Sequence, residues 1–122
     1  DEFKLIDLEC LEYSNPYLEL FELALCWSGY ESCNIDFSLF NTFIKSYFDN
    51  TNLDTNVDWE ALYYSNNGRP GWLEYNIKRA LMLECDNEEE QQLGINEVKE
   101  TVEHIIYYDK VKDEILKNIA DY

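Results

Sequence analysis

Asp7 is the residue whose type and position could do chemistry most directly. It follows an apolar Leu-Ile pair near the start of the chain, at the end of a short strand that we predict over residues 2–6. A carboxylate at the end of a strand can hold a divalent cation at the edge of a cleft. Glu9 and Glu12 lie close by and add acidic character. The alternative interpretation is an exposed loop aspartate that binds nothing.

Other side chains could also do chemistry. His104, the one histidine of the chain, could act as a general base, but nothing in the sequence pairs with it, so we expect a structural or surface role. The three tryptophans could line a pocket for a cationic group. Their helical spacing from other apolar residues instead predicts core packing. They are Trp27, Trp59 and Trp72.

The first helix that must position Asp7 begins at an Asn-Pro step. Asn15 is a favourable N-cap and Pro16 a favourable first helical residue. Gly29 marks the predicted end of this helix. Apolar residues recur at spacings of three and four and predict its buried face. They are Leu20, Leu23, Ala24 and Trp27.

Aspartates begin the next two predicted helices. Asp36 can cap a helix over residues 37–48, and Asp58 can cap a third helix that starts at Trp59. The sequence NNGRPG at 66–71 would break that helix, yet the helical period resumes at once. We therefore expect either two helices here or one helix kinked at Pro70. The predicted apolar stripe of the helix after Asp36 is Phe37, Phe40, Phe43, Ile44 and Tyr47.

The rest of the chain also has a helical period. On the resumed helix the predicted face is Trp72, Tyr75 or Asn76, Arg79 and Leu83, and Glu74 and Lys78 should form an i, i+4 ion pair. Asp86 and Glu89 form a capping box, and the glutamates at 88–90 suit the positive end of the helix dipole. The period then continues to the end of the chain through Leu93, Val98, Val102, Ile105, Ile106, Tyr108, Val111, Ile115 and Ile119. We predict an all-α fold of about five helices.

Composition excludes several classes of function. The chain has 122 residues, is 46% hydrophobic and carries a formal charge of −17, with 26 acidic and 9 basic residues. This balance argues against nucleic acids and anionic membranes as partners and is compatible with a cationic ligand or a basic partner. The four cysteines form no Cys-x-x-Cys pair and complete no zinc site with one histidine. We expect reduced thiols in a cytoplasmic protein with no membrane span.

The opening segment resembles a family of phosphotransferases. In "LIDLECLEYSNPYLELFELAL" an Ile-Asp pair (Ile6 and Asp7), an Asn-Pro step (Asn15 and Pro16) and a Glu-Leu pair (Glu19 and Leu20) follow in order. This arrangement resembles the segment after the catalytic loop of aminoglycoside phosphotransferases and choline kinase-like proteins, which share the protein kinase-like fold. The helical remainder, including "GWLEYNIKRAL", looks like the C-terminal helical part of bacterial members.

The resemblance implies roles for two residues. Asp7 would be the aspartate that holds Mg²⁺ on the ATP phosphates. Glu19 would stand where the family has an aspartate that supports the catalytic loop, although it is one methylene longer. The nucleotide-binding lobe, the catalytic base and a metal-binding Asn would lie upstream of residue 1. The resemblance thus implies that residues 1–122 are one helical subdomain, the C-terminal fragment of a larger kinase.

Two functional hypotheses remain open. In the first, the parent protein transfers the γ-phosphate of ATP to a hydroxyl of a small molecule such as an aminoglycoside or an amino alcohol. The fragment alone would be inactive, would bind neither Mg²⁺ nor ATP, and could self-associate through the face that the missing lobe leaves exposed. In the second, the chain is a stand-alone acidic helical module that binds a partner protein and has no catalytic activity.

Overall fold

The computed structural model of this protein describes residues 4, 13–66 and 68–120, and these residues are all-α. No strand occurs among them, so the all-α prediction is confirmed. The strand predicted over residues 2–6 falls, apart from Lys4, outside the described residues. The elements are α1 (Pro16–Trp27), the 3-10 turn η2 (Tyr30–Ser32), α2 (Phe37–Asp49), α3 (Trp59–Ser65), α4 (Gly68–Ala80), α5 (Glu88–Lys110) and α6 (Lys112–Ile119).

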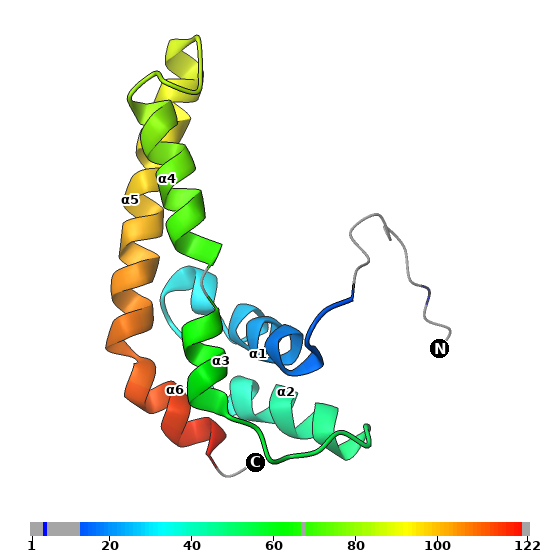
Figure 1. The fold of residues 1–122 in the computed structure, drawn as a ribbon. Coiled ribbons are helices and arrows are strands. Elements are labelled where there is room, and N and C mark those ends of the chain that lie inside the picture. Colours follow the sequence, from blue (N-terminus) through cyan, green and yellow to red (C-terminus); the bar gives the residue numbers. More distant parts are fainter. Residues whose placement is uncertain (1–3, 5–12, 67, 121–122) are drawn as a thin grey trace.

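The helices form two parts of different character. We call α1, η2, α2, α3 and α6 the body, and the antiparallel pair α4 and α5 the hairpin. Figure 1 shows the hairpin extending away from the body, with its α4–α5 turn at the far end. The long helix α5 leads back down the hairpin, and α6 then turns toward α2 and α3, the body helices that it contacts.

The predicted helix starts at Asn15, Asp36 and Asp58 are confirmed. Each of these side chains accepts a hydrogen bond from a backbone N–H two or three residues later, at 2.8 to 3.0 Å. Gly29 follows the end of α1 with φ of +100°, a conformation that glycine adopts readily. A Cβ there would also lie 2.7 Å from a backbone oxygen, so both the backbone conformation and the lack of space favour glycine at this position.

The structure corrects two predicted helix boundaries and decides between the two alternatives left open for residues 59–80. The cap of α5 is Asn87, which accepts from the Glu90 N–H at 2.9 Å, one residue after the predicted Asp86. Residues 59–80 form two helices, and Pro70 lies in the first turn of α4, where its missing N–H has little cost. The prediction that one helical period continues from the cap at Asp86 to the end of the chain is wrong, because α5 ends at Lys110 and a separate helix, α6, follows. The break at Val111 turns α6 so that Ile115 and Ile119 enter the core.

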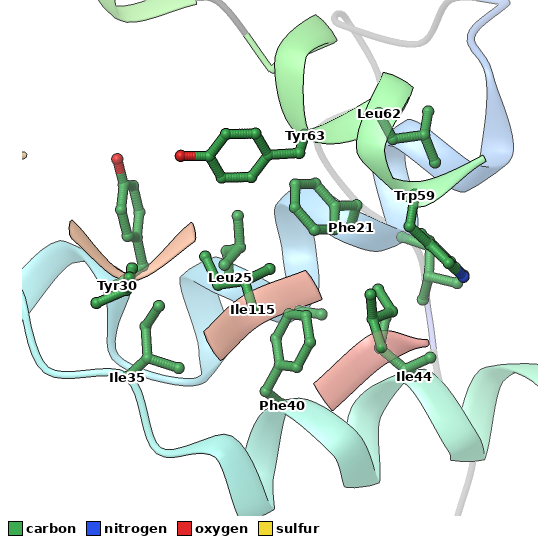
Figure 2. Close-up of a cluster of buried hydrophobic side chains, with 14 residues drawn as sticks. Phe21, Leu25, Tyr30, Ile35, Phe40, Ile44, Trp59, Leu62, Tyr63 and Ile115 are labelled. Carbon is green, nitrogen blue, oxygen red and sulfur yellow. The ribbon is translucent and has the colours of Figure 1, made fainter. Parts of the chain in front are cut away.

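The core lies between α1, α2, α3 and α6 (Figure 2). Phe21 is fully buried at its centre, with its ring edge-on to Phe40 at 6.4 Å and beside Trp59 at 6.5 Å. The predicted stripe of α2 is confirmed, since all its members are buried or packed against the core. The other fully buried apolar side chains are Leu20, Ala24, Leu25, Phe40, Ile44, Ile115 and Ile119.

The predicted buried face of α1 is only half right. Leu20 and Ala24 are buried, but Leu23 and Trp27 are 46% and 71% exposed. Phe21 and Leu25 take their places because α1 is apolar on nearly every side and α2 and α3 cover a different face. The prediction that the tryptophans pack in the core is confirmed for Trp59. It is wrong for Trp27 and for Trp72, which is 46% exposed.

The seam of the hairpin consists of small and polar residues. Its buried members are Asn76, Gly94 and Thr101. Asn76 is satisfied there, since its amide donates to the Trp72 carbonyl and its oxygen accepts from Arg79. The predicted apolar faces of this region are therefore wrong at Leu83, Leu93, Val102 and Ile106, which are exposed. The predicted Glu74–Lys78 ion pair is present at 2.9 Å.

Gly94 should be intolerant of any side chain. A Cβ at this position would lie 2.9 Å from the Ala80 backbone nitrogen and 3.1 Å from the Asn76 backbone oxygen. We expect Gly94→Val to lower the free energy of unfolding by about 1–3 kcal/mol, the range for an overpacked contact. Amide hydrogen exchange should show the loss of protection in α4 and α5.

Gly71 is the matched control on the same hairpin. Nothing lies within 4 Å of a Cβ placed there. Gly71→Ala should therefore leave stability unchanged or raise it by up to about 1 kcal/mol through helix propensity. Equal losses at the two glycines would contradict the close packing of α4 on α5.

Candidate functional site

Two adjoining hollows lie where the hairpin joins the body. They share Tyr30, Asn66 and Arg69. The first is a cavity of about 240 Å³ with aromatic walls, whose other lining residues are Tyr63, Tyr64, Pro70, Ile105, Tyr108 and Asp109. The second is wider, about 570 Å³, and its remaining lining is Glu19, Glu22, Leu23, Leu25, Cys26, Glu31 and Trp72.

Arg69 connects the hairpin to the body between the two hollows. One guanidinium nitrogen lies 2.8 Å from the Glu31 carboxylate, another lies 3.3 Å from His104 Nδ1, and the group sits 4.8 Å from the centre of the Tyr30 ring. His104 Nε2 lies 2.9 Å from the Glu31 carbonyl oxygen. A carbonyl only accepts, so we assign the proton to Nε2, which leaves Nδ1 to accept from Arg69. Both ring nitrogens of His104 thus serve a structural contact, in line with its predicted role.

A pair of tyrosines forms the rigid wall of the first hollow. The rings of Tyr63 and Tyr108 stack at 4.2 Å with an interplanar angle of 9°. Each hydroxyl donates to the other residue's carbonyl oxygen at 2.9 Å. Burial raises the pKa of Tyr63 to about 12 and raises the pKa of Tyr108 as well. Both phenols therefore remain neutral donors at any physiological pH.

The second hollow combines carboxylates with aromatic surface. Glu19 and Glu22 of α1 and Glu31 of η2 line it together with Trp72, whose indole donates to Glu97 at 3.2 Å. Burial, and secondarily the charge of Glu19, raises the pKa of Glu22. Carboxylates beside an aromatic face suit ammonium groups, which gain ion pairs and cation–π contacts there. The hollow is chemically suited to a small cationic ligand.

The two residues assigned by resemblance have different outcomes. Asp7 lies outside the described residues. Glu19 is exposed on the first turn of α1 and accepts a hydrogen bond from the Ser14 hydroxyl at 2.7 Å. The catalytic loop that it would support has no counterpart among the described residues, so both assignments stay predictions.

Sequence reasoning missed Arg69 and its partners. The segment NNGRPG indicated a helix break, and its arginine received no role. A rare cation in so acidic a chain was an available signal, because a carboxylate partner is the default expectation for it. Its particular partners could not be inferred, since Glu31 and His104 lie 38 and 35 residues away in the chain.

Comparison with known proteins identifies no relative: no family model, curated protein or solved structure matches this chain. None of the described helices is long and apolar enough to cross a membrane. Within the described part of the chain, no group of three or more His, Cys, Asp or Glu side chains is arranged to hold a metal ion.

Proposed function

We propose that this chain is the C-terminal helical part of an ATP-dependent phosphotransferase that phosphorylates a hydroxyl of a small cationic molecule, such as an aminoglycoside or an amino alcohol. The observation that carries the proposal is the opening segment, with Asp7 eight residues before an Asn15-Pro16 step that caps α1. The all-α fold is the architecture that the resemblance implies for residues 1–122. The active protein would be cytoplasmic.

The second hollow supports a role on the acceptor side of such an enzyme. Its glutamates come from α1 and η2, close in the chain to the segment that carries Asp7. Glu19 and Glu22 would bind ammonium groups of the acceptor, while Trp72 would cover an apolar part of it. The Arg69 contacts to Glu31 and Tyr30 would keep this wall in place.

Asp7 is the one residue of this chain that we assign to a metal. Its carboxylate is the hard oxygen donor that Mg²⁺ prefers, but one carboxylate does not make a magnesium site. The other ligands, and the catalytic base, are expected on a loop upstream of Asp1. When bound with ATP, Mg²⁺ would neutralise the charge that develops in phosphoryl transfer.

The reading frame upstream of Asp1 tests the proposal. We expect it to encode a catalytic loop, with an aspartate as base and an asparagine as metal ligand, shortly before Asp7. It should also encode a nucleotide-binding lobe with a lysine for the phosphates. A frame that contains no such loop would overturn the proposal.

The second candidate function is a stand-alone acidic helical module that binds a protein. The exposed apolar residues of the hairpin favour it, since such surfaces mark interaction sites. A mature protein that consists of these residues alone, and that is monomeric or dimeric, would support this candidate over the phosphotransferase.

A further inference from the structure

Four tyrosine rings form a continuous series along the first hollow. Tyr64 meets Tyr63 edge-on, with ring centres 5.4 Å apart, and Tyr63 stacks on Tyr108 at 4.2 Å. Tyr108 in turn meets Tyr30 edge-on at 5.7 Å. Figure 2 shows Tyr63 extending from α3 toward Tyr30 of η2. The hollow is therefore walled by aromatic rings that come from η2, α3 and α5.

Both ends of this ring series already carry a cation. At one end the guanidinium carbon of Arg69 lies 4.8 Å from the centre of the Tyr30 ring. At the other end Lys112 Nζ lies 4.5 Å from the centre of the Tyr64 ring. The negative face of an aromatic ring attracts positive charge at such distances. The ring series is thus a surface on which the protein itself places cations.

Each of these two cations has a carboxylate partner outside the first hollow. Arg69 pairs with Glu31 at 2.8 Å. Lys112 pairs with Glu60 at 3.3 Å. Neither glutamate lines the first hollow. Because each pair is neutral overall, it offers little repulsion to a further positive charge in the hollow.

Asp109 supplies a carboxylate to the first hollow. Burial, and secondarily the negative charge of Asp109, raises the pKa of Tyr63 to about 12, so this carboxylate lies near the ring series. Among the residues that the structure describes, Asp109 forms no ion pair or hydrogen bond. The hollow thus combines aromatic faces that attract cations with a negative charge that no cation of the described chain pairs with.

Size and charge define the class of ligand that fits this hollow. Its volume of about 240 Å³ lies below the range of roughly 300–1,000 Å³ for drug-sized ligands, so it suits a small molecule. Asp109 would repel an anion, and a neutral apolar molecule would cover this carboxylate without pairing it. An ammonium ion with short alkyl groups satisfies both the carboxylate and the rings.

We propose that the first hollow binds a small organic ammonium ion, with its charge beside Asp109 and its alkyl groups on the tyrosine rings. The inference does not rest on the proposed function, because Glu19 and Glu22, which we assign to the acceptor, do not line the first hollow. Binding here without phosphotransfer, or phosphotransfer without binding here, would separate the two proposals.

Titration of the whole protein that contains these residues with tetramethylammonium chloride tests the proposal. This ion has a charge and methyl groups but no N–H donor, so its binding reports contacts with the rings and the carboxylate. At constant ionic strength we expect saturable shifts of the NMR signals of the four tyrosine rings, with a Kd on the order of 1 mM. The neutral molecule of similar shape, tert-butyl alcohol, should bind at least about tenfold more weakly. No saturable shift with the ion, or equal binding of the alcohol, would overturn the proposal.

Two exposed positions of the hollow provide variants that should keep the fold. Asp109→Asn should weaken binding of tetramethylammonium by about tenfold, because the ion loses its opposite charge. Tyr64→Leu should weaken it by about two- to fivefold through loss of one ring face. The matched control is Asp113→Asn, the same change of charge at an exposed residue that does not line the hollow. Equal weakening by Asp109→Asn and Asp113→Asn would overturn the proposal, because only the net charge would then matter.

The same titration with a short peptide that carries trimethyl-lysine distinguishes the source of the ammonium group. Tighter binding of tetramethylammonium would support a free small molecule, and tighter binding of the peptide would support a lysine side chain of a partner protein. In either case Asp109→Asn should weaken the tighter ligand by about tenfold. Binding of both ligands that is insensitive to Asp109→Asn would overturn the proposed site.

Discussion

Phe21→Ala is expected to lower the free energy of unfolding by about 3–5 kcal/mol, the range for removing a buried aromatic ring. Phe21 is fully buried between Phe40 and Trp59, where α1 meets α2 and α3. Alanine would leave a cavity that three helices line, and helices packed on one another can close it only in part. Urea unfolding followed by circular dichroism measures the loss.

Trp27→Ala on the same helix is the control for this prediction. Trp27 is the larger ring, but it is 71% exposed at the end of α1. Its removal should change the free energy of unfolding by less than about 1 kcal/mol. A larger loss of unfolding free energy for Trp27→Ala than for Phe21→Ala would contradict this prediction, because it would show that α1 buries its other face in the core.

This pair of variants separates what sequence predicts from what packing decides. The caps at Asn15, Asp36 and Asp58 were predictable, because a capping side chain and its N–H partners lie within three residues. The buried face of α1 was not, because the helix is apolar nearly all round and more than one stripe fits its period. Only the placement of α2 and α3 decides which stripe is buried.

The boundaries of α5 illustrate the same limit. Asp86 and Asn87 are adjacent and both are good caps, so sequence alone could not choose between them. The break at Val111 leaves the apolar period uninterrupted on both sides. The break lets Ile115 and Ile119 of α6 become buried against the other body helices. This reason is tertiary, and the local sequence does not contain it.

The candidate site was predictable only in part. The short motif with Asp7 and Asn15-Pro16 is visible in the sequence, as is the acidic character of α1. The contacts of Arg69 with Glu31 and His104 are not visible in the sequence, because they bring together η2, the start of α4 and a later part of α5. The same holds for the stacked pair Tyr63 and Tyr108, which lie 45 residues apart. Long-range pairs of this kind follow from the fold.

The largest expected effect on activity is that of Asp7→Asn in the whole protein. If Asp7 is a Mg²⁺ ligand, the amide keeps the size of the side chain and removes the charge that holds the metal. Metal stabilisation of a phosphoryl transition state amounts to several kcal/mol, so the rate should fall by about 100- to 1000-fold. The matched control is Asp113→Asn, the same change on the exposed first turn of α6, which should alter the rate by less than about twofold.

The most direct measurement is therefore Mg²⁺-dependent transfer of the γ-phosphate of ATP, with a set of aminoglycosides and amino alcohols as acceptors. The whole protein and its two Asp→Asn variants would be compared side by side. We expect transfer by the unaltered protein and by Asp113→Asn, with a loss of about 100-fold or more confined to Asp7→Asn. Equal rates for all three proteins, or no Mg²⁺-dependent turnover of ATP by the unaltered protein, would contradict a phosphotransferase that uses Asp7.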